Sequence, residues 1–397
     1  MKKKITILGS TGSIGSTTLR IIDYKRELFE IDTLIANSNY KKISNQLLRF
    51  KPKHFVILDP TTYKSIKKKF KKHKTKIFNH YKDIPKKLKK NDIVVAAIPG
   101  IAGLEATIYY TAKTKKILIA NKESIICGWN IIYNVSKKNK TLIVPIDSEH
   151  FSISKLINNS NIQEIKKIYI TASGGPFLNL PKKKFRNIKP SEAIKHPKWK
   201  MGNKISVDSA TLMNKILEIL EAQKLFKVNI NKYEIIIHPQ SLIHAIVKYK
   251  NGISKFLYHE PDMIIPISNA IFDSKFDFND FTNNDFNNQD IIKNLEFRKI
   301  DKIKFNVVKL IPKLNDYIST PIVINAANEI LVDQFLKKKI RFNSIIQYLF
   351  LVLKDKNYKK YAIYKPINLK NIYIIDSWTR MTTLKIIEKR EKIWINI

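Results

Sequence analysis

The chain has 397 residues, of which 44% are hydrophobic and 10% aromatic, so it can bury a substantial core. These values exclude a disordered or collagen-like chain. Lysine and arginine number 73 against 33 acidic residues, and the net charge of +40 raises nucleic acid or an acidic membrane surface as partners. Lysine, isoleucine and asparagine are frequent throughout, as an AT-rich coding sequence would produce, so the charge alone does not establish such a partner.

Cysteine and hydropathy patterns indicate the compartment. The single cysteine, Cys127, has mostly apolar neighbours, which predicts a buried, inert thiol in a reducing environment. The basic start Met1-Lys-Lys-Lys precedes too short an apolar run for a signal peptide. The longest apolar stretch, residues 93–104, is broken by Pro99-Gly100 and is shorter than the ~20 residues that span a bilayer. We therefore expect a soluble, unprocessed cytoplasmic protein with no membrane partner.

Residues 1–147 alternate short β-branched runs with longer segments of helical character. This alternation predicts βαβ units on a doubly wound parallel sheet, a Rossmann-like domain. The expected strands are residues 5–8, 31–36, 55–58, 93–97, 117–120 and 142–145.

The pattern changes after residue 147. Residues 148–271 contain strands punctuated by glycine and proline around one strong helix, which predicts a central α+β domain. Residues 272–304 are rich in Asn, Asp and Phe with little periodicity, which predicts a linker. Apolar residues at helical spacing then predict a C-terminal helical domain over 305–397. The expected strands are 168–172, 233–237 and 245–249, and the clearest expected C-terminal helices are 322–336 and 345–353.

A glycine motif, Gly9-Ser-Thr-Gly12-Ser-Ile-Gly15, directly follows the first expected strand and opens a helix. Its G-x-x-G-x-x-G spacing is a variant of the dinucleotide fingerprint. The glycines let the backbone approach a pyrophosphate, whose charge the N–H groups at the helix N-terminus hold. A merely tight strand-to-helix turn is the alternative.

The end of the second expected strand indicates which dinucleotide is bound. Residues 36–42 read Ala-Asn-Ser-Asn-Tyr-Lys-Lys, without the carboxylate that an NAD enzyme places on the ribose 2′-hydroxyl. Ser38, Asn39 and the nearby Lys41 and Lys42 would accept a 2′-phosphate, which favours NADP over NAD.

Two acidic segments suit a divalent cation. Asp147 and Glu149 follow a strand, and carboxylates at i and i+2 on an extended chain point to the same side. A surface acidic pair is the alternative here.

The second acidic segment is the helix expected over residues 210–224, which carries a polar arc opposite an apolar one and has Asp208-Ser209 at its N-cap position. This polar face offers a phosphate the helix N-terminus and Lys215, and offers a metal Glu218. A solvated helix with ion pairs is the alternative. The polar arc consists of Thr211, Asn214, Lys215, Glu218 and Glu221.

Between these segments lies Ser173-Gly-Gly-Pro176, which offers backbone donors suited to an anion. A lysine- and proline-rich segment follows and ends in His196-Pro-Lys-Trp199-Lys-Met-Gly202. A loop of this kind with an aromatic residue is a candidate lid that excludes water once substrate is bound. A disordered basic loop is the alternative.

Taken together, these motifs resemble the 1-deoxy-D-xylulose 5-phosphate reductoisomerase family. The resemblance runs from Gly9 to the segment Asn325-Ala-Ala-Asn-Glu329 and is weak beyond it. The motifs that carry it, in the family's order, are Gly-Ser-Thr-Gly-Ser-Ile-Gly, Ala-Asn-Lys-Glu-Ser, Pro-Ile-Asp-Ser-Glu-His, Ser-Gly-Gly-Pro-Phe, Lys-Ile-Ser-Val-Asp-Ser-Ala-Thr and His-Pro-Gln-Ser.

The resemblance implies a homodimeric oxidoreductase with isomerase activity. Residues 1–147 would form its NADPH-binding domain, and residues 148–271 its central α+β catalytic domain, which binds metal and substrate. The enzyme would convert 1-deoxy-D-xylulose 5-phosphate to 2-C-methyl-D-erythritol 4-phosphate with NADPH, in isoprenoid biosynthesis by the methylerythritol phosphate pathway. The implied metal is Mg²⁺ or Mn²⁺, with Co²⁺ a further candidate, held by Asp147, Glu149 and Glu218. The implied catalytic residues are Lys122, Glu149, Glu218 and His196. The implied substrate residues are Lys122, Ser148, Glu149, Ser173, His196, Ser209, Asn214, Lys215 and Glu218. The implied cofactor residues are Thr11, Gly12, Ser13, Ile14, Asn37, Ser38, Asn39, Asn121, Glu123 and Gly202.

The sequence departs from the family pattern at two places. Asn37-Ser38-Asn39 stands where the family has Gly-Lys-Asn, and the expected lid around Trp199 carries Lys198 and Lys200 where the family has small or neutral polar residues.

Two other functions compete. A basic nucleic-acid-binding protein would use lysine runs at 67–69, 86–90 and 182–184, but the chain lacks a nucleic-acid-reading motif, so we expect no specific nucleic-acid partner. A different NADP-dependent dehydrogenase would leave the carboxylates without a role.

Overall fold

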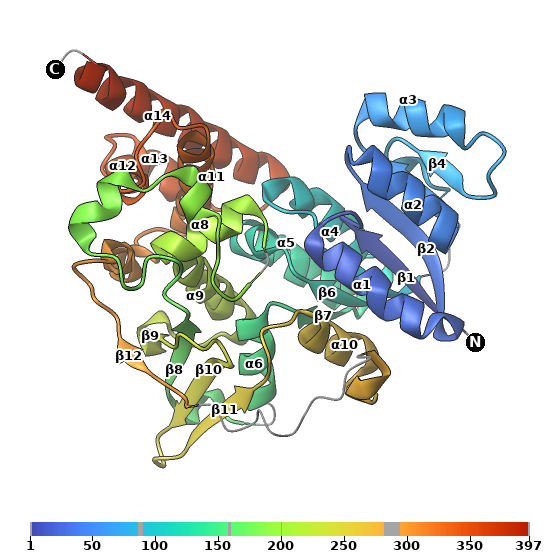
Figure 1. Cartoon of the computed structure of the whole chain (residues 1–397), viewed down its shortest axis with the longest axis horizontal. Helices are drawn as coiled ribbons and strands as arrows, with labels where there is room; N and C mark the ends of the chain where they lie inside the picture. Colours follow the sequence, from blue (N-terminus) through green and yellow to red (C-terminus); the bar gives the residue numbers. More distant parts are fainter. Residues whose placement is uncertain (1, 86–89, 158–159, 200, 282–293, 396–397) are drawn as a thin grey trace. The chain divides into compact units, whose positions relative to one another are not determined.

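The computed structural model describes residues 2–85, 90–157, 160–199, 201–281 and 294–395 (Figure 1). The chain forms two compact units. The first comprises residues 1–124, 131–151 and 262–292, and the second comprises residues 125–130, 152–261 and 293–397. The four-part division expected from the sequence stays a prediction, and residues 282–293 of its linker lie outside the described residues.

The first unit contains a seven-stranded sheet in the order β4-β3-β2-β1-β5-β6-β7, and every pair of neighbouring strands is parallel. This topology confirms the predicted doubly wound, Rossmann-like fold. The strands are β1 (Lys3–Leu8), β2 (Phe29–Ala36), β3 (His54–Ile57), β4 (Lys76–Phe78), β5 (Asn91–Ala96), β6 (Thr114–Ile119) and β7 (Leu142–Pro145). The helices are α1 (Ser13–Tyr24), α2 (Tyr40–Phe50), α3 (Pro60–Lys69), α4 (Leu104–Thr111) and α10 (Ile264–Phe272). Helices α5 (Lys122–Asn139) and α6 (Ser148–Leu156) contribute residues to both units.

Helix α10 completes the core of the first unit although it comes from a distant part of the sequence. Its buried Ile264, Ile267 and Ile271 belong to the same apolar cluster as residues of β1, α1 and α2. The buried Lys116 of β6 donates hydrogen bonds to the carbonyl oxygen of Ala270 (2.8 Å) and to Oδ1 of Asp273 (2.7 Å). The sheet is therefore covered by a segment that follows it by more than a hundred residues.

The second unit contains a mixed five-stranded sheet in the order β11-β10-β8-β9-β12 and a helical C-terminal part (Figure 1). Helix α11 packs against α8, α12 and α14. The helical character predicted for the C-terminal region is confirmed. The strands are β8 (Ile165–Ala172), β9 (Tyr233–Ile237), β10 (Ile243–Tyr249), β11 (Ser254–Tyr258) and β12 (Arg298–Lys299). The helices are α7 (Pro190–Ala193), α8 (Asn203–Thr211), α9 (Met213–Phe226), α11 (Thr320–Leu336), α12 (Ser344–Val352), α13 (Tyr358–Ala362) and α14 (Leu369–Ile395).

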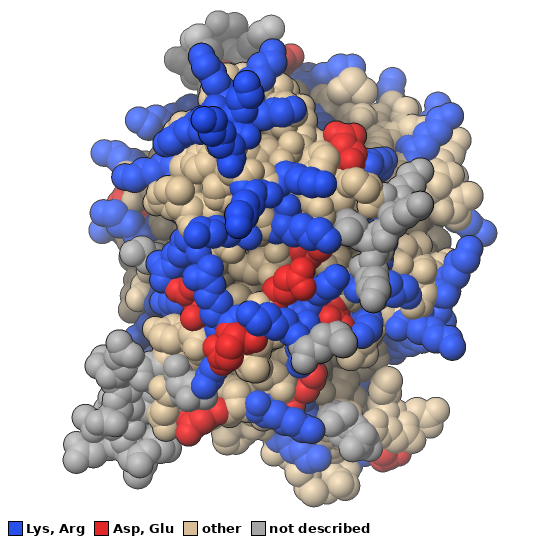
Figure 2. All heavy atoms as spheres, turned by 90° about the vertical axis from the view of Figure 1, so that its right-hand side faces the viewer, with Lys and Arg blue, Asp and Glu red and all other residues tan. Residues whose placement is uncertain are grey.

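The basic residues are spread over the face drawn in Figure 2. Lysine and arginine side chains appear across most of this face, with acidic side chains between them, and they do not gather into one stripe. Within the part of the chain that the structure describes, no helix is long and apolar enough to cross a membrane. The single cysteine, Cys127, is buried as predicted.

Candidate active site

The glycine motif forms the turn between β1 and α1. Gly9 has a φ of +87°, and a Cβ built there would lie 2.6 Å from the carbonyl oxygen of Ala97. A Cβ on Gly15 would lie 2.3 Å from the carbonyl oxygen of Gly9, so only glycine allows the helix to approach the turn this closely. Gly12 precedes α1 without a side-chain cap, and Ser13 and Ile14 are its first helical residues. The first amides of α1 follow directly on this turn, as anion binding requires.

The end of β2 lies beside this turn. Asn39 caps α2, because its Oδ1 accepts a hydrogen bond from the amide of Lys42 (3.0 Å). The ammonium of Lys42 donates a hydrogen bond to the carbonyl oxygen of Thr11 (2.9 Å). Of the two lysines considered from the sequence, Lys42 is therefore held by a hydrogen bond at the turn formed by residues 9–15. This turn is called the nucleotide turn below.

Asn121 and Lys122 lie between β6 and the body of α5, as Asn39 lies between β2 and α2. Asn121 caps α5 by accepting a hydrogen bond from the amide of Ser124 (2.5 Å), and its Nδ2 donates to the carbonyl oxygens of Ile98 and Gly100. This side chain thereby joins the loop after β5 to the loop after β6. Lys122 and Glu123 form the first turn of α5, and both are buried.

Asp147 follows the edge strand β7 and lies in a charged hydrogen-bond network. Its carboxylate accepts hydrogen bonds from the ammonium of Lys122 and, at 3.0 Å, from Nδ1 of the fully buried His150. Burial raises the pKa of Asp147, but the charge of Lys122 and the hydrogen bond from His150 outweigh burial and hold this pKa well below its usual range. The carboxylate of Asp147 is therefore anionic at neutral pH.

The expected extended backbone at Asp147 and Glu149 is wrong. Helix α6 begins at Ser148, so Glu149 lies in the first turn of the helix. A negative side chain at this position stabilises the helix by interacting with its dipole. The hydroxyl of Ser148 donates to Oε2 of Glu149 (2.6 Å), and both residues are buried. The surface acidic pair considered as an alternative is thus excluded for Glu149.

In the second unit, β8 ends in the Ser173-Gly-Gly-Pro176 loop. Gly174 and Gly175 have φ angles of +83° and +65°, and a Cβ on Gly175 would lie 3.0 Å from the carbonyl oxygen of Ser209 in α8. Successive left-handed residues of this kind turn backbone amides toward one side, which suits an anion. The loop and Ser209 are therefore close together.

The segment expected to act as a lid is connected to this loop. Nε2 of His196 lies 3.0 Å from Oγ of Ser173, and Nδ1 of His196 accepts a hydrogen bond from the amide of Trp199 (2.9 Å). The half-buried indole of Trp199 meets the ring of His244 edge-on at 5.9 Å. His196 and Trp199 thus lie beside the predicted phosphate site.

The single helix predicted over residues 210–224 is wrong, because the chain bends at Leu212. Helix α8 ends at Thr211 and α9 begins at Met213, and Leu212 between them has a φ of +61°. Asp208 and Ser209 lie inside α8 and do not cap α9. A left-handed non-glycine residue costs ~1–2 kcal/mol, which burial of the leucine side chain offsets.

The polar arc of α9 is buried as well as the apolar one, so the solvated helix considered as an alternative is excluded. Glu218 is fully buried and accepts hydrogen bonds from Nδ2 of Asn214 and from the ammonium of Lys215 (2.9 Å). A buried carboxylate needs such partners because desolvation of an isolated charge is costly. The two donors therefore satisfy the carboxylate of Glu218 in a water-poor environment.

One positioning contact was not recognised in the sequence. Nδ2 of Asn328 in α11 donates to Oδ1 of Asp208 in α8 (2.7 Å), and the ammonium of Lys204 lies 2.9 Å from the other carboxylate oxygen. Asn328 and Asp208 are buried, whereas Lys204 is partly exposed. The Asn325-Ala-Ala-Asn-Glu329 segment was seen only as a motif, yet Asn328 fixes the helix that carries Ser209. The partner of Asn328 is 120 residues away, so no local pattern could reveal it.

Known proteins were compared with the chain. The family model described as 1-deoxy-D-xylulose 5-phosphate reductoisomerase matches residues 5–128. Models described as C-terminal domains of the same enzyme match residues 143–226 and 259–382. A protein of that name from Pelagibacter ubique (strain HTCC1062) is 45% identical over 385 residues, which is 96% of this chain and 98% of the relative.

Two solved structures have the same fold over nearly their whole length. A DOX-P reductoisomerase in complex with NADPH, fosmidomycin and magnesium is 32% identical with a TM-score of 0.88, and the match covers 97% of this chain and 98% of that one. The reductoisomerase from Zymomonas mobilis in complex with NADPH is 32% identical with a TM-score of 0.86, and the match covers 98% and 100%.

Proposed function

The chain belongs to the 1-deoxy-D-xylulose 5-phosphate reductoisomerase family, and from this premise we propose which of its residues perform the reaction. It converts 1-deoxy-D-xylulose 5-phosphate to 2-C-methyl-D-erythritol 4-phosphate, as an NADPH-dependent oxidoreductase of the methylerythritol phosphate pathway. The observation that carries this function is the 45% identity with a relative of that name over 96% of the chain. Its cofactors are NADPH and a divalent cation, as in the related structures.

Asp147, Glu149 and Glu218 are the proposed metal ligands, a set of carboxylates able to bind a metal ion. Their chemistry fits the group, because Mg²⁺ and Mn²⁺ prefer oxygen ligands and Asp147 is held in its anionic form. When bound, the cation polarises the ketone of the substrate for rearrangement, and NADPH supplies the hydride for the reduction. Lys122 and His150 orient Asp147, and Asn214 and Lys215 orient Glu218.

The proposed phosphate-binding residues are Ser173, Ser209, Asn214 and Lys215. Support comes from the glycine loop after β8, which lies against the carbonyl oxygen of Ser209, and from the buried ammonium of Lys215. Binding the phosphate far from the reacting carbons supplies energy that keeps the substrate in register between the two steps. Ser148, Lys122 and His196 are proposed to contact the sugar, and His196 reaches Ser173 already. The proposed catalytic residues are Lys122, Glu149, Glu218 and His196.

All the proposed cofactor residues except Gly202 follow the carboxyl ends of parallel strands, where open α/β sheets bind dinucleotides. The turn after β1 receives the pyrophosphate, and the end of β2 receives the adenosine. Asn121 and Glu123 follow β6, and Gly202 precedes α8. The full proposed set is Thr11, Gly12, Ser13, Ile14, Asn37, Ser38, Asn39, Asn121, Glu123 and Gly202.

The experiment that tests this function mixes the purified protein with NADPH, Mg²⁺ and 1-deoxy-D-xylulose 5-phosphate and follows the absorbance of the reduced cofactor. We expect oxidation of NADPH, its loss after chelation of the metal, and its recovery with Mg²⁺, Mn²⁺ or Co²⁺. NMR of the product separates the rearranged, branched polyol from the unbranched one. An unbranched product would favour a dehydrogenase without rearrangement, and no oxidation at all would refute the proposal.

A homodimer is proposed as the working assembly. Strand β11 lies at one edge of the five-stranded sheet and exposes 52% of Phe256, and Ile253, just before the strand, is 54% exposed. An exposed apolar edge strand is a surface that proteins usually cover. Light scattering should give twice the mass of the chain for the wild type and a smaller mass for Phe256→Lys, and a wild-type monomer would contradict the proposal.

A further inference from the structure

Residues 36–39 at the end of β2 carry no charged side chain, so the charge that balances the ribose 2′-phosphate of NADPH has to come from another residue. We propose that Lys42 binds this phosphate and thereby determines the preference for NADPH over NADH. The inference rests on the proposed function, since it concerns the cofactor of that reaction.

Residues 36–39 supply neither a carboxylate nor a cation. Ser38 and Asn39 offer neutral hydrogen-bonding groups, and Asn39 uses its Oδ1 to cap α2. A phosphate dianion is bound most strongly by charged donors. The nearest cations along the chain are Lys41 and Lys42 in the first turn of α2, and both are exposed.

Helix geometry separates the two lysines. Residues at i, i+4 and i+7 share one face of a helix, so Lys42, Gln46 and Arg49 lie on one side of α2. Gln46 fixes this face against the nucleotide turn, because it accepts a hydrogen bond from the hydroxyl of Ser10 (2.7 Å) and donates one to the carbonyl oxygen of Ser10 (2.9 Å). Lys41 is one position away, about 100° around the helix axis.

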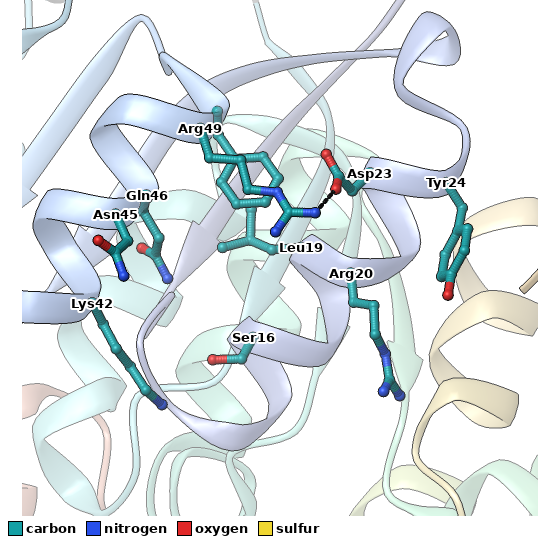
Figure 3. A pocket seen from close by; sticks show the side chains of 10 residues that line it. Ser16, Leu19, Arg20, Asp23, Tyr24, Lys42, Asn45, Gln46 and Arg49 are labelled. Carbon is teal, nitrogen blue, oxygen red and sulfur yellow. Dashed lines mark hydrogen bonds and ion pairs between the residues drawn. The ribbon is translucent and has the colours of Figure 1, made fainter.

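The face of α2 that carries Lys42 forms one wall of a groove of about 550 Å³, and α1 forms the other wall (Figure 3). Lys42 lies near Ser16 at the end of the groove where α1 begins, and its ammonium donates to the carbonyl oxygen of Thr11 at 2.9 Å. An ammonium carries three N–H donors, so this bond uses one of them. Lys41 does not line the groove.

The arginines of the groove are less suitable. Arg49 pairs with Asp23 and lies over the ring of Phe50, at the end of the groove away from the turn. Arg20 lies on α1, one turn beyond Ser16, and is 4.0 Å from Asp262. Lys42 is the cation of this groove that follows the end of β2, where the adenosine is proposed to bind, and that is also hydrogen-bonded to the turn proposed for the pyrophosphate.

The test compares binding of two probes by calorimetry: adenosine 2′,5′-bisphosphate, which carries the 2′-phosphate, and adenosine 5′-monophosphate, which does not. Lys42→Met should weaken the bisphosphate about tenfold and leave the monophosphate unchanged, because hydrogen bonds to charged groups are the strong ones. Lys41→Met is the matched control and should change neither affinity. Lys42→Glu should in addition shift the KM ratio toward NADH.

Three results would overturn the inference. They are an unchanged bisphosphate affinity in Lys42→Met, an equal loss in Lys41→Met, and a loss that appears only in Arg20→Gln. Thermal unfolding of each variant shows whether it is folded. The wild-type turnover assay is scored separately, so an inactive wild type that still discriminates between the probes would refute the proposed reaction and leave the assignment of Lys42 standing.

Discussion

The two proposed anion sites of this molecule differ in their main donors. In the first unit, the turn between β1 and α1 is formed by glycines, and its proposed donors are the backbone amides at the start of α1. In the second unit, a glycine loop follows β8 as well, but most of the donors proposed for the substrate phosphate are side chains, including the buried Lys215 of α9. A site made of backbone amides requires that the backbone approach the anion closely, and it tolerates changes in the charge of nearby side chains. A site made of buried side chains requires particular charged residues, each with a hydrogen-bond partner. The predictions below test this contrast.

The largest effect is expected for Glu218→Gln. The variant keeps the shape of the side chain but removes a proposed metal ligand, and we expect turnover to fall about a thousandfold, as loss of several kcal/mol of electrostatic stabilisation would produce. Steady-state kinetics over a Mg²⁺ titration measures this. Glu234→Gln, at an exposed carboxylate paired with Lys167, is the control and should retain full activity. Full activity of Glu218→Gln would show that Glu218 is not a metal ligand.

The backbone site should respond to one added methyl group. Gly15→Ala places a Cβ against the carbonyl oxygen of Gly9, so the helix must move away from the turn, and we expect NADPH affinity to fall tenfold or more and stability by ~1–3 kcal/mol. Gly252→Ala is the control, because its φ of +91° also costs stability but its Cβ would meet no neighbour. NADPH fluorescence titration and thermal unfolding separate the two variants. Unchanged NADPH binding in Gly15→Ala would contradict a backbone-built site.

Bound ligands should slow proteolysis of the predicted lid by a few fold. His196 and Trp199 already hydrogen-bond to each other near Ser173, and an anion at this site should order the segment further. Limited trypsin digestion within residues 182–200 should therefore slow when NADPH and fosmidomycin are both present. Lys200 itself lies outside the described residues. Equal rates with and without ligands would argue against a lid.

The smallest effect concerns long-range charge. Because the net charge is +40, added salt should lower kcat/KM for the anionic substrate while kcat stays steady, since screening acts beyond about 8 Å near physiological ionic strength. Binding to duplex DNA should be weak and lost at that ionic strength, because it depends on counterion release. Salt-resistant binding to one DNA or RNA sequence would revive the nucleic-acid alternative.

The contrast between the two sites also explains what the sequence could predict. Six of the seven strands of the parallel sheet, and the glycine turn, are encoded by contiguous residues and were predicted closely. The short edge strand β4 was missed. Helix α6 was mistaken for extended chain because the residues that precede it form a strand. The bend at Leu212 was missed because leucine rarely adopts a positive φ, and tertiary packing imposes this conformation.

The sequence predicted the partners of individual side chains less well than it predicted helices and strands. The bond between Asn328 and Asp208 joins residues 120 positions apart, and no periodicity marks it. The sequence could indicate that a lysine near the end of β2 meets the 2′-phosphate, but choosing Lys42 over Lys41 required the position of Gln46 against Ser10. The choice of the three carboxylates that are proposed to hold the metal came from the family resemblance, because spacing alone left the alternatives open.

The return of α10 to the first unit affects the order in which the protein can fold during synthesis. Ile267 and Ile271 belong to the core of a sheet whose last strand ends at Pro145, so the apolar face that they cover stays open while the intervening residues are made. At a translation rate of ~5–20 residues per second, this interval is on the order of ten seconds. During it, the nascent nucleotide-binding sheet presents unburied isoleucine and phenylalanine side chains to chaperones and to neighbouring chains.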